Sequence, residues 1–311
     1  MANPQFNINF MAARRPLGIL SLALVIGSVV LLFTRGLNLG LDFTGGTLVE
    51  VGSSEPIELN EVRAVLADNG WTNATVQHFG SPTEALIRVA PREGRDASEV
   101  GQAVFDQLAA QMPNLENKPR RIEFVGPQVG DELRDESGLA MLMALGAMLI
   151  YVWFRFSNKF GVSTVLALFH DVLIVLGTFS LVQWRVDLTV LAAVLALIGY
   201  SLNDSIVVAD RVRENFRNTR MDDPIAIIND ALNRTFSRTM VTSITTLLVL
   251  IALFLFGGEV MRAFSEALIV GVIIGTYSSI YVASNVLMLM KVSKEDFMLP
   301  EKAQEEIDEM P

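Results

Sequence analysis

Cysteine is absent from this sequence of 311 residues, and histidine occurs only twice. The lack of thiols excludes disulfide bonds, thiolate metal sites and a cysteine nucleophile. The two histidines, His78 and His170, form no ligand cluster for zinc or iron. Neither the GxGxxG nor the GxxxxGK[ST] spacing occurs, which argues against nucleotide binding. These absences predict a protein that has no metal, no cofactor and no enzyme activity.

Charged residues are also scarce, at 19% of the chain, whereas hydrophobic residues make up 51% and the mean hydropathy is +0.42. This composition is typical of a membrane protein rather than a soluble globule. The net charge is −10, and basic residues gather at the ends of apolar runs, which argues against nucleic acid as a partner. The lipid bilayer is the expected surrounding.

Six apolar runs organise the chain, each close to the ~20 residues that cross the hydrocarbon layer. They are Leu17–Phe33, Gly138–Phe154, Phe160–Val182, Leu188–Ala209, Met240–Phe256 and Ala263–Met290. No small-residue cleavage pattern follows the first run before Arg35, so we expect a retained helix rather than a signal peptide. The predicted organisation is an N-terminal segment 1–16, helix 1 at 17–34, an external domain 35–137, helices 2–6 within 138–292 with a connection at 210–238, and an acidic tail 293–311.

Positive charge predicts the orientation of these helices. With six spans, four basic clusters fall on one side: Arg14 and Arg15, Arg155 and Lys159, the group Arg211, Arg213, Arg217, Arg220 and Arg234, and Lys291 and Lys294. The opposite short connections carry only Arg185 and Arg262. By the positive-inside rule, both termini lie in the cytoplasm and segment 35–137 lies in the periplasm.

The external segment shows alternating strand and helix patterns. Strands are predicted at Thr47–Val51, Ala74–Phe79, Ala85–Val89 and Arg120–Val125, and helices at Leu59–Ala67 and Ala97–Gln111. The order strand, helix, strand, strand, helix, strand is that of an α+β ferredoxin-like domain. The predicted fold class is therefore a polytopic α-helical membrane protein with such a domain between helices 1 and 2.

Two glycine-containing segments flank this domain. LDFTGGT contains Asp42, Gly45 and Gly46 where the chain enters it, and RIEFVGPQVG contains Gly126 and Pro127 where the chain leaves it. A structural interpretation suffices for both, because glycine permits a positive φ in a tight turn and Gly-Pro ends a strand. The alternative is that these segments couple the external domain to the membrane helices.

Asp204 is the most informative residue, because a charge inside a membrane helix costs roughly 2.5–3.5 kcal/mol and marks a functional site by default. It precedes Asp210 in the fourth run and lies ~9 Å inside the helix end. Ser201 and Asn203 add to a polar face there. One interpretation is a hydrogen bond between helices; the other is a carboxylate that gains and releases a proton.

Arg238 is the local candidate for a partner of Asp204. Together with Thr242 it begins a polar stripe at helical spacing ahead of the fifth run. An arginine at a helix end is equally typical of a cytoplasmic anchor, so the sequence leaves both roles open.

Asp171 and His170 lie in the middle of the third run, at an even costlier depth. Because neighbouring helical residues point about 100° apart, we expect that the two side chains do not pair. Asp171 is predicted to be either a second relay carboxylate or a structural one, and His170 a hydrogen-bonding residue of the bundle.

The segments LDFTGGT, RIEFVGPQVG, ALFHDVLIVLG, GYSLNDSIVVADRVREN and RTMVTSITT, in this order around six spans, resemble the SecF branch of the SecD/SecF family of protein-export membrane subunits. The resemblance implies a partner, SecD, and an assembly related to proton-driven transporters of the resistance-nodulation-division type. It also implies work with the SecYEG channel, in which the proton gradient promotes movement of unfolded secretory polypeptides, and a functional Asp and Arg that match Asp204 and Arg238. Two alternatives remain: a passive assembly subunit, or half of a proton-coupled small-molecule transporter.

Overall fold

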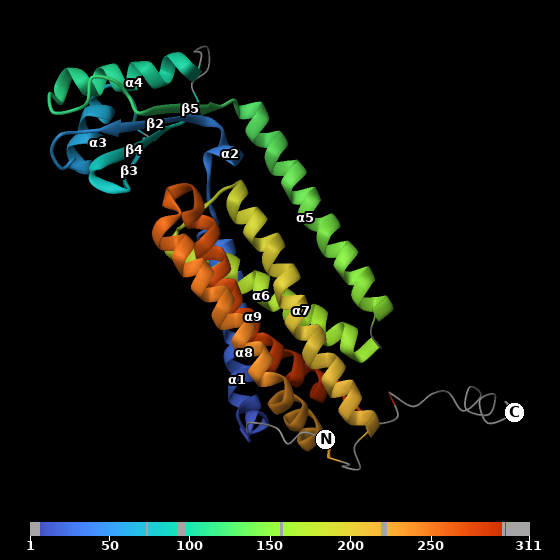
Figure 1. The fold of residues 1–311 in the computed structure, drawn as a ribbon. Helices are drawn as coiled ribbons and strands as arrows, with labels where there is room; N and C mark the ends of the chain where they lie inside the picture. Colours follow the sequence, from blue (N-terminus) through green and yellow to red (C-terminus); the bar gives the residue numbers. More distant parts are fainter. Residues whose placement is uncertain are drawn as a thin grey trace, which may run out of the picture.

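The structure of the chain is a computed structural model that describes residues 7–72, 74–91, 97–155, 158–218, 223–293 and 296. It has two parts, a bundle of long helices and a smaller domain of helices and strands at one end of that bundle (Figure 1). Most of the predicted acidic tail lies outside the described residues. The described part contains six helices that are long and apolar enough to cross a membrane, which confirms the predicted fold class.

The six helices contain the six apolar runs. They are α1 (Arg14–Thr34), α5 (Pro127–Arg155), α6 (Asn158–Val182), α7 (Leu188–Asn218), α8 (Pro224–Phe256) and α9 (Gly258–Leu289), and a short 3-10 helix η1 (Phe10–Ala13) precedes α1. Among them α6 and α9 are the most buried, so they form the centre of the bundle, whereas α1, α5 and α8 expose most of their surface.

Three helices continue well beyond their apolar runs. α5 begins at Pro127 rather than at Gly138, α7 continues past Asp210 to Asn218, and α8 already begins at Pro224. Hydropathy detects only the part of a helix that lies in lipid, whereas charged residues continue a helix in water. Proline at the first turn of α5 and α8 suits such a start, because its fixed φ matches the helix. The predicted connection at 210–238 is therefore largely helical.

The external domain has the predicted order of elements: β2 (Gly46–Gly52), α3 (Leu59–Asp68), β3 (Thr75–Phe79), β4 (Ser81–Val89), α4 (Ala97–Gln111) and β5 (Arg121–Val125). The strands form an antiparallel sheet in the order β3-β4-β2-β5. This order is the ferredoxin-like arrangement that the sequence pattern predicts. Alternation along the strands sends one set of side chains, including Val49, Val51 and Ile87, into a core with residues of α3 and α4.

The other face of the sheet is turned toward the chain that enters the domain. Leu48 of β2 and Leu86 of β4 form a small apolar cluster with Leu41, which belongs to a short helix α2 (Leu41–Thr44). The sequence did not predict α2, because four residues show no periodicity. It places the LDFTGG segment between the sheet and the membrane helices (Figure 1).

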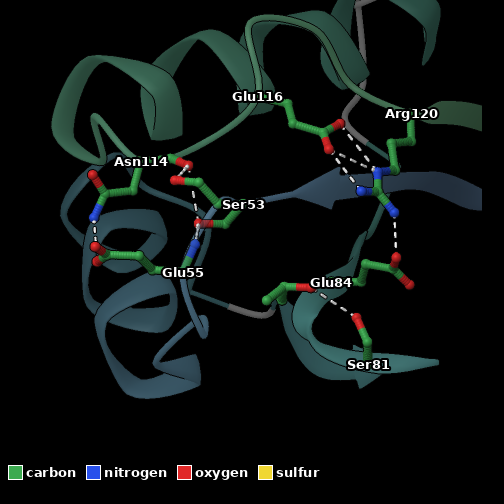
Figure 2. A network of polar contacts seen from close by, with 9 residues as sticks. Ser53, Glu55, Ser81, Glu84, Asn114, Glu116 and Arg120 are labelled. Atoms are coloured by element: carbon green, nitrogen blue, oxygen red, sulfur yellow. Dashed lines mark hydrogen bonds and ion pairs between the residues drawn. The ribbon is translucent and has the colours of Figure 1, made fainter.

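A polar network holds the edges of the domain together (Figure 2). The guanidinium of Arg120 donates to Glu116 (Nη2 to Oε1, 2.6 Å) and to Glu84 of β4. Nearby, Asn114 Nδ2 donates to Glu55 Oε2 at 2.9 Å, and Ser53 Oγ donates to the carbonyl oxygen of Asn114 at 3.0 Å. These contacts fix the segment between α4 and β5 against the rest of the sheet.

This network predicts a pH-dependent contribution to stability. Hydrogen bonds from Arg120 lower the pKa of Glu116, against a smaller opposing effect of burial. A lowered folded-state pKa stabilises the fold above the unfolded pKa of about 4.3, and this stabilisation is lost as pH falls through the folded value. Arg120→Gln should therefore lower the urea midpoint at pH 7, and the difference from wild type should shrink below about pH 4.

The measurement is the fluorescence of Trp71, which is buried in the domain core, in a background where Trp153 and Trp184 are phenylalanine. Lys118→Gln, a nearby exposed charge, is the control for net charge. A difference between Arg120→Gln and wild type that stays constant down to pH 3 would show that the ion pairs do not carry the effect.

Candidate functional site

Asp204 lies where three helices meet. It belongs to α7, its side chain is only 9% exposed, and both carboxylate oxygens accept hydrogen bonds from hydroxyl groups. Thr239 of α8 donates to Oδ1 at 2.7 Å, and Ser279 of α9 donates to Oδ2 at 2.5 Å. The carboxylate therefore links α7, α8 and α9 through neutral partners.

Asp171 occupies a second, fully buried position on α6. Its Oδ2 accepts from Ser201 of α7 at 2.5 Å and from Ser278 of α9 at 2.7 Å, and its Oδ1 lies 2.9 Å from Nδ1 of His170. Ser201 thus contacts Asp171 rather than supporting Asp204. The expectation that His170 and Asp171 cannot pair is wrong. Their Cβ atoms point in different directions, but the two side chains are long enough to meet beside the helix.

α9 connects the two carboxylates through adjacent residues. Ser278 donates to Asp171 and Ser279 donates to Asp204, so one short segment holds both sites. The polar contacts continue from Thr276 to Ser243 of α8 at 2.7 Å, and Tyr200 donates to Ser243 at 3.0 Å. The sequence pattern did not point to Thr239, Ser278 or Ser279. The available signal was the hydroxyl-rich stretch TYSS inside an apolar run. Hydroxyl groups in such a run are candidate hydrogen-bond donors for a carboxylate in a neighbouring membrane helix.

The structure separates Arg238 from Asp204. In the described part of the chain Asp204 accepts from Thr239, whereas the side chain of Arg238 is exposed on the outer surface of α8. Thr239 faces α7, and Arg238, about 100° away around α8, faces outward. Thr242 and Asn203, also predicted to support the site, are exposed as well, and Thr242 Oγ1 donates to the carbonyl oxygen of Arg238 at 2.5 Å. Arg238 therefore lies at the level of Asp204 but points out of the bundle.

The external domain is joined to α7 by a second set of contacts. A short strand β1 (Asn38–Leu39) pairs in parallel with β6 (Arg185–Val186), which precedes α7. Asp42 of α2 accepts from the backbone N–H of Leu188 at 3.0 Å, so a residue of the external segment satisfies one of the free N–H groups at the start of α7. Asp187 caps the same turn through Thr189 and Val190.

The two glycine-containing segments meet at this junction. Gly45 and Gly46 have φ of 63° and 123°, and a Cβ at Gly46 would lie 2.6 Å from the carbonyl oxygen of Val89. A Cβ at Gly130, in the first turns of α5, would lie 2.8 Å from the backbone nitrogen of Gly45. Gly126 has open space around it, and α5 begins at the next residue, Pro127. Glycine is therefore required at Gly46 by its backbone conformation and its contact with Val89, and at Gly130 by the close approach of the two segments.

A charged cavity of about 230 Å³ adjoins the cap. Asp42, Arg88, Arg185 and Asp187 are among its lining residues, and Arg88 donates to the carbonyl oxygen of Leu39 at 3.0 Å. Burial and, to a smaller extent, the charge of Arg185 lower the pKa of Arg88 to about 10, against the opposing effects of Asp42 and Asp187. Arg88 is therefore still a cation at neutral pH, and it ties the sheet to the β1 strand.

A matched pair of substitutions tests the role of glycine at this junction. Gly46→Ala should destabilise the external domain by roughly 1–3 kcal/mol, because alanine is strained at positive φ and its Cβ would press on a backbone carbonyl. Gly126→Ala should have little effect, because nothing lies within 4 Å of its Cβ position. Thermal unfolding of the purified full chain measures both. Equal losses in the two variants would contradict this assignment.

Comparison with known proteins identifies relatives for almost the whole chain. Residues 104–293 match the family described as protein export membrane protein SecD/SecF, C-terminal, and residues 30–57 match the SecD/SecF GG motif. The protein translocase subunit SecF of Pseudomonas aeruginosa is 46% identical over 98% of this chain and 98% of its own length. The SecF of Vibrio alginolyticus is 45% identical, over 98% of this chain and 97% of its own length.

Solved structures show the same fold. The crystal structure of SecDF, a translocon-associated membrane protein from Thermus thermophilus, superposes with a TM-score of 0.83 and 37% identity over 94% of this chain. The super-membrane-facing form of SecDF gives a TM-score of 0.69 at 36% identity over 99% of this chain. The chain spans only 40% and 41% of these two SecDF chains.

Proposed function

Because this chain belongs to the SecF family of protein translocase subunits, we propose that it acts as a proton-driven subunit of protein export. It is a multi-pass inner membrane protein. In the proposal its termini are cytoplasmic and its α+β domain is periplasmic. It works with SecD and the SecYEG channel, and it promotes outward movement of unfolded secretory polypeptides. The observation that carries the proposal is the buried Asp204 carboxylate, which only hydroxyl groups hold in the described part of the chain.

Hydroxyl partners suit a carboxylate that changes its protonation state. A serine or threonine hydroxyl can donate to a carboxylate and can rotate to accept from a carboxylic acid. The contacts from Thr239 and Ser279 can thus be remade in either state, whereas the charge, which is costly in the membrane, is present in only one. Protonation of Asp204 changes how strongly α8 and α9 are drawn toward α7. Asp171 is the second relay carboxylate of the proposal, coupled to the first through Ser278 and Ser279.

α7 is the element that carries the change to the outside. Asp204 lies roughly 24 Å along α7 from Leu188, at ~1.5 Å per residue. Leu188 is the residue whose N–H is capped by Asp42, next to the GG turn that enters β2. A shift of α7 along or about its axis acts directly on this cap. In the proposal, Asp42, Gly45, Gly46, Gly126 and Pro127 form the coupling between proton site and periplasmic domain.

The exposed polar residues of α7 and α8 support a membrane partner at this face. Asn203, Arg238 and Thr242 point outward beside exposed apolar residues such as Val241 and Ile244. Ionisable and polar side chains in membrane helices face partner helices or cavities rather than lipid. We assign this face to SecD, which in the proposal corresponds to the part of the SecDF chains that this chain does not cover. Arg238 then acts across the interface between subunits rather than as the counter-ion of Asp204 within this chain.

Asp204→Asn tests the proton role. Asparagine keeps the shape and an acceptor oxygen but cannot be ionised, so we expect the subunit to insert and to co-purify with SecD while export loses its stimulation by the proton gradient. The measurement is export of a secretory protein into inner membrane vesicles with and without the gradient. Asp210→Asn, on the exposed end of the same helix, is the control. If export by Asp204→Asn keeps its gradient dependence, the carboxylate only joins helices and the subunit is a passive assembly component.

Asp42 tests the coupling separately. Asp42→Ala removes the acceptor from the α7 N-terminus, which typically costs ~1 kcal/mol, whereas Asp42→Asn keeps a capping oxygen. We expect faster amide hydrogen exchange at Leu188 and weaker gradient-stimulated export in the alanine variant, and smaller changes in the asparagine variant. Faster exchange at Leu188 together with normal export in Asp42→Ala would exclude the cap from the coupling path.

A further inference from the structure

A groove of about 530 Å³ lies on the outer surface of the bundle, between α1 and α9. Its walls are mainly apolar and include Ile19, Leu22 and Val25 of α1 and Val282 and Leu289 of α9. Ile19, Leu22 and Leu289 are 70%, 61% and 81% exposed, so the groove opens outward, to the side where lipid surrounds a membrane protein. Neither carboxylate site uses these side chains.

The groove is as long as one leaflet of the bilayer. From Arg14 at one end to Val25 at the other, α1 rises ~16 Å, about half of the ~30 Å hydrocarbon thickness. On α1 the lining of the groove ends at Val25, and beyond it α1 packs closely against α6, where a Cβ at Gly177 would overlap Ser28. A transmembrane helix of a partner would need a surface that continues through both leaflets, whereas an acyl chain needs only one.

The charge at the mouth of the groove is positive. Arg14 and Arg15 line the end that the positive-inside rule places at the cytoplasmic surface. Nη1 of Arg14 is buried and has no hydrogen-bond partner within the described residues. A backbone contact fixes the position of this arginine, since Asn285 Nδ2 donates to the carbonyl oxygen of Arg14 at 2.7 Å. A guanidinium with an unpaired donor is suited to a phosphate group, which it can bind through two hydrogen bonds.

We propose that this groove binds one phospholipid with an anionic headgroup from the cytoplasmic leaflet. Its phosphate group binds Arg14 and Arg15, and an acyl chain lies along Ile19, Leu22 and Val25. His170 also lines the groove; it is 5% exposed, and its Nδ1 contacts Asp171. The acyl chain therefore passes the side of the bundle on which His170 lies between the groove and the fully buried Asp171. Lipid binding at this site does not depend on the proton role proposed for the carboxylates.

The test uses the full chain, alone and co-purified with SecD, in nanodiscs of equal parts phosphatidylglycerol and phosphatidylethanolamine. Native mass spectrometry then reports which lipid remains bound. We expect the wild type to retain one phosphatidylglycerol. The double variant Arg14→Gln, Arg15→Gln should bind it ~25-fold more weakly, because each basic residue near an anionic surface contributes a factor of about five.

Two further variants separate this site from general charge effects. Arg213→Gln with Arg217→Gln removes the same charge from the same side of the membrane, at the end of α7, and should retain the lipid. Val25→Phe fills the inner end of the groove without changing charge, and should lower retention even if the arginine variant inserts poorly.

Three results would overturn the proposal. The first is equal loss of phosphatidylglycerol from both double variants. The second is retention of phosphatidylethanolamine as strongly as phosphatidylglycerol. The third is loss of the bound lipid when SecD is present, which would mean that a partner helix occupies the groove.

Discussion

The packing of the helix bundle is constrained by two carboxylates within the membrane, each of which requires hydrogen-bond donors. Water does not reach the hydrocarbon layer, so each carboxylate must find its donors in neighbouring helices. Ser278 and Ser279 of α9 meet this need for Asp171 and Asp204 together. Because the two serines are adjacent, α6, α7 and α8 must all approach one short stretch of α9. This explains why α9, with α6, is among the most buried of the spanning helices.

The same constraint makes α7 mechanically important. α7 contributes Asp204 to one carboxylate site and Ser201 to the other, and its outer end is capped by Asp42 from the external segment. In the proposed mechanism this helix, which has contacts at both ends, transmits movement from the carboxylates to the external segment. The glycines of the junction belong to this arrangement, since Gly46 permits a backbone conformation and Gly130 a close approach that a larger residue would prevent.

The chain also has two different outer surfaces. Around α8 the exposed side chains include an arginine and hydroxyl groups, whereas the groove beside α1 is mainly apolar and carries its charges at its mouth. A partner helix can satisfy polar groups at any depth, but lipid offers charges only at the headgroup level. The depth at which polar groups occur is therefore the feature on which the two proposed assignments, SecD at α8 and lipid beside α1, depend.

Sequence alone determined the six spans and the ferredoxin-like order of the external domain. A helix that crosses lipid needs a long apolar run and a half-buried strand needs alternating residues, and both patterns are visible in the local sequence. It also identified Asp204 and Asp171, since a charge in an apolar run is conspicuous in any fold. Their partners were decided by tertiary structure. The sequence favoured Arg238 as the partner of Asp204, whereas the structure places Thr239 there. It also assigned Ser201 to Asp204 rather than to Asp171, and it did not pair His170 with Asp171. Such contacts depend on the rotation of each helix about its axis, and packing against the other helices sets that rotation.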